Sequence, residues 1–337
     1  MPAASPVKVT VLMTLYNKGP YVEEAIRSVL QSTFKDFELL VVDDRSTDDG
    51  LERVLRSADP RIRVLTHPVN TGRAAAATRG IRAARGQYLA ILDADDVMLP
   101  ERLQKQVELM DRETDVIACG SQAEFMDDGS PVGKWPEDDK TCRAMALFGD
   151  PVLYPTAIFR TASLLEAGLF PDPEWRRPGM DYLFLLKIAT LSGMRFVNLP
   201  EVLTLYRRGE QNMRHGRDAY EDRKAIYREV FRRYGKGVSE EELDLQMFIH
   251  GIGGGNIQSI GVPALFRWKK KLLGLKGTAP IFPEHGFEKV VEERWDRAFH
   301  RLADRSPSAG ALHLIYSRDL RPARIYYLLT RLLNSAA

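Results

Sequence analysis

The sequence predicts an α/β fold in which a mostly parallel central sheet is flanked by helices and followed by a helical C-terminal region. Over roughly the first 100 residues, apolar runs of strand length alternate with amphipathic helical patterns. The strand runs are apolar at nearly every position, which is typical of parallel strands buried on both faces. From about residue 210 onward, charged amphipathic helices take over. We therefore expect an α/β domain over residues 1–210 and a helical region over residues 211–337.

The elements of the first hundred residues follow in order. The expected strands cover residues 7–15, 37–42, 62–65 and 88–92. Pro20 stands where a helix can begin, because its missing N–H would have no partner in the first turn. Ser46, Thr47 and Asp48 offer N-caps for a short second helix. An alanine-rich pattern predicts a third helix over residues 72–84.

The elements after residue 100 are more varied. The pattern predicts a helix over residues 100–110, a strand over 116–125 and a hairpin-type turn at 127–129. It then predicts a helix over 144–148, a short strand over 156–159 and an apolar helix over 181–191. Residues 195–206 contain two short predicted strands that are separated at Leu199 and Pro200.

The composition limits the class of protein. Of the 337 residues, 44% are hydrophobic and 28% are charged, as in ordinary soluble proteins. The net charge of +2 argues against a dedicated nucleic-acid binder. Two cysteines, Cys119 and Cys142, offer no disulfide framework and fit a reducing cytoplasm. No apolar stretch approaches the ~20 residues that cross a bilayer, so any membrane contact is expected to be peripheral, at the inner face.

Polar residues follow each predicted parallel strand, where sheets of this kind bind their ligands. They occupy positions 14–17, 43–44, 66–73 and 93–96. The first strand is followed by no G-x-G-x-x-G turn, and the chain has no G-x-x-x-x-G-K-[ST] stretch. These absences count against dinucleotide-binding and P-loop proteins.

Three carboxylates stand at the end of the fourth predicted strand. Asp93, Asp95 and Asp96 follow an apolar run. Such a cluster needs a cation or hydrogen-bond donors to neutralise it. Hard oxygen ligands suit Mg²⁺ or Mn²⁺ shared with a diphosphate. The alternative is a solvated acidic turn before the helix that starts near Pro100.

Four of these segments, in this order, resemble the signature of family-2 glycosyltransferases. They are residues 13–18 (MTLYNK), 41–48 (VVDDRSTD), 70–73 (NTGR) and 92–96 (LDADD). The resemblance covers about residues 7–210. It departs from the usual pattern at Thr14, where many members carry proline, and at Arg45, where glycine is commoner. It implies a GT-A (Rossmann-like) fold and an inverting transfer from a UDP- or dTDP-linked sugar.

The resemblance also implies roles for individual residues. Asp44 would accept the imide N–H of a uracil or thymine ring, and Asp95 would coordinate Mn²⁺ or Mg²⁺ through the diphosphate. Arg73 would reach the phosphates as a bidentate donor, with a solvated helix-start arginine as the alternative. The implied nucleotide-sugar contacts are Thr14, Tyr16, Asn17, Asp44, Arg73, Asp93 and Ala94.

Asp181 is the candidate general base. The acceptor hydroxyl must lose its proton on the face opposite the departing phosphate, and the family carries a Glu-Asp or Gly-Asp pair at this helix start. Here Met180 precedes the aspartate; the alternative is a carboxylate favoured by the helix dipole. Further candidates are His215 as a metal ligand, with a lone surface histidine as the alternative, and Trp175 in an acceptor cleft, with a packing tryptophan as the alternative. Arg207 is a candidate for contact with the diphosphate or an anionic acceptor.

The predicted function is transfer of a sugar to a hydroxyl of a glycan or lipid-linked acceptor in bacterial surface polysaccharide synthesis. A sugar nucleotidyltransferase and a non-catalytic nucleotide-sugar or glycan binder are the alternatives.

Two C-terminal segments combine basic and apolar side chains. Residues 266–273 (FRWKKKLL) fit an anionic membrane surface, a lipid-linked acceptor or a helix with one packed face. Residues 325–329 (IYYLL), with nearby arginines, leave the same choice and add oligomer packing.

Overall fold

The computed structural model describes residues 7–191, 193–208, 218–252 and 260–335. The chain divides into two compact units, Met1–His215 and Gly216–Ala337. The predicted α/β fold is confirmed in the first unit, and the predicted helical character is confirmed in the second. The roles assigned to the two regions stay predictions.

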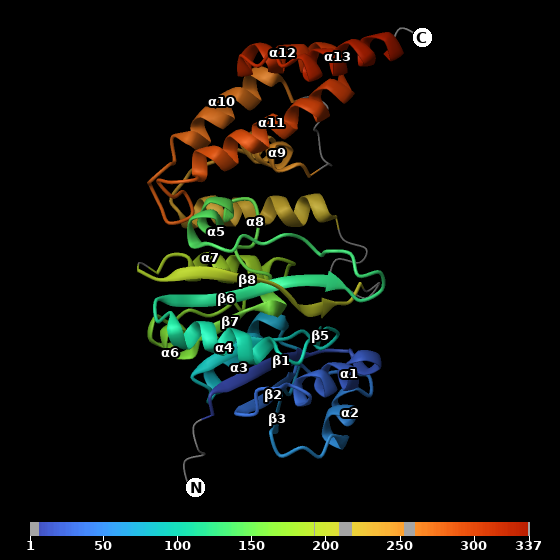
Figure 1. Ribbon diagram of the computed structural model, residues 1–337, viewed down its shortest axis with the longest axis vertical. Helices are drawn as coiled ribbons and strands as arrows, with labels where there is room; N and C mark the ends of the chain where they lie inside the picture. The colour runs from blue at the N-terminus through green and yellow to red at the C-terminus, as the bar shows by residue number, and fades with distance from the viewer. Residues whose placement is uncertain (1–6, 192, 209–217, 253–259, 336–337) are drawn as a thin grey trace. The chain divides into compact units, whose positions relative to one another are not determined.

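One eight-stranded sheet forms the centre of the first unit (Figure 1). The strand order is β3-β2-β1-β4-β7-β6-β8-β5, and the first four strands in this order are parallel. Strand β7 runs antiparallel to both neighbours, whereas β6 and β8 are parallel. The strands are β1 (Val9–Leu15), β2 (Phe37–Asp43), β3 (Ile62–Thr66), β4 (Tyr88–Ile91), β5 (Val97–Met98), β6 (Val116–Phe125), β7 (Ile158–Arg160) and β8 (Arg195–Tyr206).

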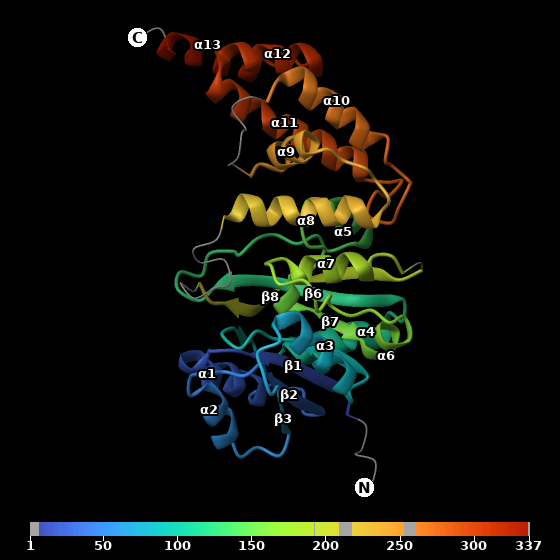
Figure 2. The ribbon, with the colours of Figure 1, turned by 180° about the vertical axis from the view of Figure 1, so that it is seen from behind.

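Helices cover both faces of this sheet (Figures 1 and 2). Apolar side chains of α1, α2 and α4 pack against one face, beside alternate residues of β1 such as Val11 and Met13. Helix α3 lies on the other face, where Gly80 lets it approach Leu12 closely. The helices of this unit are α1 (Gly19–Leu30), α2 (Gly50–Arg56), α3 (Arg73–Ala83), α4 (Arg102–Arg112), α5 (Asp139–Met145), α6 (Thr161–Glu166) and α7 (Met180–Ile188), with a 3₁₀ turn at Tyr154–Thr156.

Three local expectations were wrong. Residues 195–206 form one strand rather than two, because β8 skips from Leu199 to Val202 in its pairing with β6 and thereby accommodates Pro200 in an irregularity. Helix α5 begins at Asp139 instead of 144, since the Asp138 side chain caps it by accepting from the Thr141 N–H. Strand β5 was missed, and its two residues pair with β8.

The second unit consists of helices in its described residues (Figure 2). Its core is rich in aromatic side chains, including the buried Trp268 and Trp295. A capping box formed by Ser239 and Glu242 starts α9. The helices are α8 (Ala219–Arg233), α9 (Glu240–His250), α10 (Val262–Leu273), α11 (Phe287–Arg305), α12 (Pro307–Ser317) and α13 (Pro322–Ser335).

The basic and apolar segment 266–273 lies on α10 and contributes to this core. The indole of Trp268 is 2% exposed and donates to the Gln246 side chain at 3.1 Å. Phe266 contacts the rings of Trp295 and Tyr316 at centroid distances of 5.7 and 4.8 Å. The structure thus favours the packed-helix interpretation of this segment.

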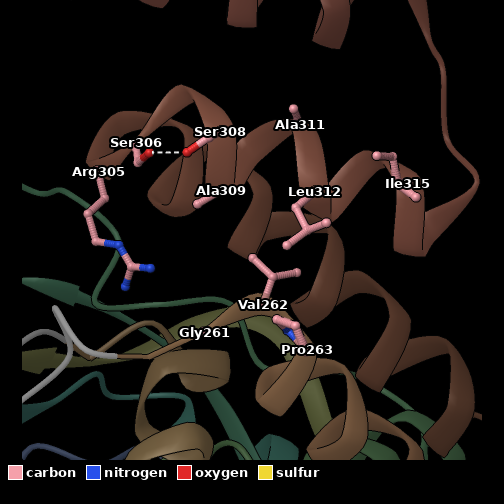
Figure 3. Close-up of a pocket in the computed structure, with 10 residues that line it drawn as sticks. All are labelled: Gly261, Val262, Pro263, Arg305, Ser306, Ser308, Ala309, Ala311, Leu312 and Ile315. Carbon is pink, nitrogen blue, oxygen red and sulfur yellow. Dashed lines mark hydrogen bonds between the residues drawn. The ribbon is translucent and has the colours of Figure 1, made fainter.

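A pocket of about 980 Å³ lies in the second unit, between the start of α10 and the α11–α12 corner (Figure 3). Its lining is largely apolar, with Arg305 as the one charged lining residue, and none of the predicted site residues lines it. Within the described part of the chain, the helices are all too short or too polar to span a membrane.

Candidate functional site

The predicted site residues of the first unit gather at one edge of the sheet. Because β1, β2, β3 and β4 are parallel and in register, the loops that follow them emerge side by side. Leu15 pairs with Asp43, and Asp43 pairs with Thr66. The loop after β4 carries Asp93 and Asp95 to the same edge. The topology therefore brings together segments that are up to about 80 residues apart in sequence.

Asp44 organises the loop between β3 and α3. Its Oδ1 accepts from the Thr71 N–H at 2.8 Å and from the Thr71 hydroxyl at 2.7 Å, and it lies 2.8 Å from Nδ1 of His67. Its Oδ2 accepts from the Gly72 N–H at 2.6 Å. Burial would raise the pKa of Asp44, but these hydrogen bonds outweigh burial and lower it. The carboxylate is therefore held ionised at the position where the resemblance expects base recognition.

Gly72 itself occupies a left-handed position, with φ of +90°. A Cβ at this position would meet Nη1 of Arg176 at 2.7 Å. The glycine of the NTGR segment thus allows the loop to turn against Asp44 and to approach Arg176.

Asn17 joins the loop after β1 to the loop after β2. Its side-chain oxygen accepts from the Thr47 N–H at 2.8 Å, and its own N–H donates to the Ser46 hydroxyl at 3.1 Å. Asn17 and Arg45 both have positive φ, 51° and 64°, which explains why glycine suits the position of Arg45. In this structure the Asn17 amide holds loops together, and its predicted contact with the donor stays a prediction.

Two of the three carboxylates after β4 form ion pairs with basic side chains. Asp95 pairs with the Lys18 ammonium at 2.5 Å, and Asp93 accepts two bonds from Nη2 of Arg73, at 2.8 and 3.0 Å. Burial, together with the neighbouring carboxylates, raises the pKa of Asp93 despite Arg73. These groups therefore form an acidic cluster whose charges are only partly balanced.

Asp96 is the most deeply buried of the three. It is 1% exposed; its Oδ1 accepts from the Arg207 N–H at 2.9 Å, and its Oδ2 has no hydrogen-bond partner in the described structure. Burial first, then Asp93 and Asp95, raise the pKa of Asp96 well above its usual value.

Asp181 lies close enough to Arg73 and Asp93 to influence the pKa of both. It sits in the first turn of α7, and its Oδ1 accepts from the Tyr182 N–H at 2.9 Å. Burial would lower the pKa of Arg73, but Asp93 and then Asp181 outweigh burial and raise it. The same carboxylate contributes to the raised pKa of Asp93. A candidate base, a candidate phosphate-binding arginine and the cluster after β4 are thus brought together.

The remaining predicted residues occupy varied positions. Thr14 is half-buried, Tyr16 is 46% exposed and Ala94 is 2% exposed, so Tyr16 is the most accessible of these three residues. Trp175 is half-buried and donates its indole N–H to the Pro178 carbonyl at 3.1 Å, within its own loop. His215 lies outside the described residues.

Arg207 supports the acidic cluster from the end of β8. Its Nε donates to the Asp95 carbonyl at 2.9 Å, and its guanidinium pairs with Glu24. It also lies over the Tyr21 ring, 4.7 Å from the centroid. With these contacts Arg207 fixes the backbone of the cluster, and its predicted contact with an anion stays a prediction.

Three side chains at the site had no predicted role. Lys18 pairs with Asp95. Tyr154, 3% exposed in the 3₁₀ turn, has its ring 5.6 Å from the Arg73 guanidinium. Burial and then Asp93 raise the pKa of Tyr206. Tyr206 could have been suspected from the sequence, because Arg207 and Arg208 follow it. The residues around Tyr154 do not mark it as a site residue.

The residues after β4 fit a divalent cation that is coordinated partly by carboxylates and partly by phosphate oxygens. No group of three or more His, Cys, Asp or Glu side chains that could hold a metal by itself occurs in the described ranges. Asp96 Oδ2 is nevertheless a buried oxygen without a hydrogen-bond partner in the described structure, and Asp95 and Asp181 act together with burial to raise the pKa of Asp93. Carboxylate oxygens are the ligands that Mg²⁺ and Mn²⁺ prefer. Asp95 and Asp93 are the residues that would hold such an ion.

Several known proteins are similar to this chain in sequence. The family model described as "Glycosyl transferase family 2" matches residues 10–164. A relative in Escherichia coli, UDP-Glc:alpha-D-GlcNAc-diphosphoundecaprenol beta-1,3-glucosyltransferase WfgD, is 33% identical over 132 residues, which are 39% of this chain and 52% of the relative. The chain spans between 26 and 65% of the length of this and seven other curated relatives that it matches.

Two solved structures share the fold. S. aureus TarS 1-349 in complex with UDP-GlcNAc has a TM-score of 0.59 at 20% identity, over 94% of this chain and 89% of that one. The mannosyltransferase PcManGT from Pyrobaculum calidifontis, in complex with GDP-Man and Mn²⁺, has a TM-score of 0.53 at 18% identity, over 98% and 87%. The predicted GT-A fold is thereby confirmed. Over residues 10–164, just under half of its length, this chain is similar to glycosyl transferase family 2.

Proposed function

We propose that this chain is an inverting glycosyltransferase that moves a sugar from a UDP- or dTDP-linked donor to a hydroxyl of a glycan or lipid-linked acceptor. The observation that carries the proposal is the pairing of Arg73 with Asp93 at the sheet edge that binds ligands in parallel folds, with the Asp181 carboxylate near enough to influence the pKa of both. A bacterial surface polysaccharide stays the predicted product, and the cytoplasm stays the predicted compartment.

The chain's own side chains supply what a direct displacement needs. The acceptor oxygen forms a bond to the anomeric carbon while the bond from that carbon to the phosphate oxygen breaks, which inverts the configuration. Asp181 takes the proton of the acceptor hydroxyl as general base. Arg73 donates to the phosphates of the leaving nucleoside diphosphate. Because Arg73 is engaged with Asp93 in this structure, the donor phosphates would replace or share that contact.

A divalent cation, when bound at Asp95, would offset the charge of the leaving diphosphate. The clustering of three carboxyl groups after β4, one of which has a buried oxygen without a partner in the described structure, supports this part of the proposal. The name of WfgD supports a UDP-linked donor and a lipid-linked acceptor, and the TarS complex supports a UDP-linked donor. The PcManGT complex contains Mn²⁺ but a GDP-linked sugar, so the nucleotide needs a direct test.

A thermal-shift panel tests the proposal as a whole. Nucleotide-sugars that bind the folded chain raise its melting temperature by mass action. We expect UDP- or dTDP-sugars to raise the melting temperature when Mn²⁺ is present. We also expect that transfer or hydrolysis of the sugar releases the nucleoside diphosphate. A shift by a nucleoside triphosphate and a sugar phosphate, with release of pyrophosphate, would instead indicate a sugar nucleotidyltransferase. Donor binding without any turnover would indicate a non-catalytic binder.

Replacing Asp95 by alanine is expected to abolish the Mn²⁺-dependent part of both the thermal shift and turnover, since the carboxylate would no longer hold the ion. Lys18→Met is the matched control, because it removes the ammonium that pairs with Asp95 but leaves the carboxylate. This control should keep its Mn²⁺ response. Full Mn²⁺-dependent activity of Asp95→Ala would remove the metal assignment.

Replacing Asp44 by alanine is expected to weaken UDP binding by roughly tenfold or more. The variant loses the hydrogen bond between the imide N–H of uracil and a charged carboxylate, and such bonds are stronger than bonds between neutral groups. Isothermal calorimetry measures the affinity. Asp59→Ala is the matched control, because Asp59 pairs with Arg61 just before β3, at the opposite end of that strand from the site.

Thr71→Val separates base recognition from loop support. It removes the hydroxyl that donates to Asp44 but keeps the carboxylate. A loss of affinity as large as that of Asp44→Ala would show that Asp44 acts through the loop. Unchanged affinity of Asp44→Ala would reject both roles.

A further inference from the structure

Helix α13 exposes an apolar face, which we call the α13 face: Ile325, Tyr326, Leu329, Leu332 and Leu333. These side chains are between 40 and 72% exposed. They recur every three or four residues, so they line one side of the helix. No ionisable residue of the described part of α13 falls within this stripe. Single exposed apolar residues are ordinary, whereas a contiguous stripe of five marks an interaction surface.

The opposite side of α13 already holds the helix on the second unit. Leu328 is 8% exposed and belongs to an apolar cluster with Phe299, Ala303 and Leu314. Arg324 pairs with Asp319 at 2.7 Å, and Arg331 pairs with Asp304. The α13 face is therefore not needed to attach the helix.

Exposed basic residues stand at the end of this face, at the α12–α13 corner. Arg321 there also pairs with Asp296 and Asp319, whereas Arg324 and Arg331 pair with acidic residues on the opposite side of α13. The Asp319 carboxylate is engaged by Arg321 and Arg324, whose hydrogen bonds lower its pKa despite some burial. At the α12–α13 corner, exposed Arg318 and Arg321 flank Leu320, which is 69% exposed.

This charge distribution favours an anionic lipid surface over a second copy of the chain as the partner of the α13 face. Two copies of the chain that met through the α13 face would bring two arginine-rich corners close together, which disfavours self-association. An anionic lipid surface instead attracts the arginines and accepts the apolar side chains. The other basic segment, on α10, is unsuited because Trp268 and Leu272 are buried.

We propose that the α13 face docks on the surface of an anionic membrane, with α13 lying in the plane of the interface. The leucines and Tyr326 enter the boundary between headgroups and acyl chains, and the corner arginines stay among the lipid phosphates. The contact is peripheral and does not depend on the proposed sugar transfer.

Flotation of the full chain with lipid vesicles tests this proposal without any sugar donor, so its outcome is separate from that of the donor-binding experiments. We expect binding to phosphatidylcholine vesicles that contain phosphatidylglycerol, weak binding to phosphatidylcholine alone, and loss of binding as salt rises. The double variant Leu329→Ser and Leu333→Ser should lower the partition constant by about tenfold per leucine. Leu55→Ser, which changes a leucine that is 64% exposed on α2, is the matched control and should bind normally.

A charge variant provides an independent check. Arg318 has a φ of +53°, so Arg318→Asn removes the charge but keeps a residue that tolerates this conformation. It should lower binding to the anionic vesicles by about fivefold. Absent binding, equal binding to both kinds of vesicle, or undiminished binding of the double variant would overturn the proposal. So would an oligomer, seen by sedimentation, that the double variant dissociates while vesicles do not bind.

Discussion

Replacing Asp181 by asparagine is expected to lower turnover by about 10²- to 10⁴-fold, the usual contribution of a positioned general base. Asparagine has nearly the same shape and keeps an oxygen that can accept from the Tyr182 N–H, but it cannot take the proton of the acceptor hydroxyl. Donor affinity should be retained, because Asp181 is not expected to contact the nucleotide. Release of nucleoside diphosphate measures turnover, and calorimetry measures donor affinity.

Glu174→Gln is the control for this variant. Glu174 is an exposed carboxylate in the loop that precedes α7, so its change removes one negative charge from the same region without touching the proposed base. Its turnover should stay close to that of the unchanged chain. If Asp181→Asn turned over at the parental rate, another group would have to be the base. If it lost donor binding as well, its role would be to shape the donor site.

Replacing Arg102 by methionine is expected to lower the free energy of unfolding by about 3 kcal/mol or more. Arg102 is fully buried on α4, and its guanidinium donates to the carbonyls of Pro155 and Ile91, each at 2.8 Å, and to Gln106. Methionine fills a similar volume but leaves these buried oxygens with fewer donors. Denaturant unfolding measures the change.

Arg112→Met is the matched control, because the Arg112 side chain is 68% exposed at the end of the same helix. Its effect should stay within about 0.5 kcal/mol, as for most surface changes. Burial lowers the pKa of Arg102 to about 10, so the arginine stays protonated at neutral pH. An Arg102→Met protein as stable as the control would show that the buried oxygens find other partners or water.

Arg102 also connects stability to the site. It holds Ile91 and Pro155, which lie just before Asp93 and just after Tyr154 in the chain. The Arg102→Met protein should therefore also bind the donor more weakly. Without the hydrogen bonds from Arg102, the backbone next to Asp93 and Tyr154 is held less firmly.

The first four strands were predictable to within two residues at each end, because β1, β2 and β4 are runs of buried, mostly apolar residues and β3 mixes apolar with polar residues at mostly half-buried positions. The start of α5 was missed although Asp138 and Thr141 form a recognisable cap. Strand β5 was not predictable, since a two-residue strand has no periodicity and forms only through its pairing with β8. Pro200 suggested a break that the irregular β6–β8 pairing absorbs.

Much of the candidate site was predictable from the rule that ligands bind beyond the carboxyl ends of parallel strands. The placement of Asp44, Asp93 and Asp95 at one edge follows from it. The partners of these carboxylates did not follow, because contacts such as Lys18 with Asp95 join segments 77 residues apart. Nor does the sequence distinguish a side chain that contacts a ligand from one, such as Asn17, that ties two loops together.

The most direct test of this account is a calorimetric titration of the unchanged chain with UDP and with dTDP, each in the presence and absence of Mn²⁺. The account predicts saturable, one-to-one binding of at least one of these nucleotides, which weakens strongly when Mn²⁺ is removed. Absence of saturable binding for both nucleotides in the presence of Mn²⁺ would contradict it.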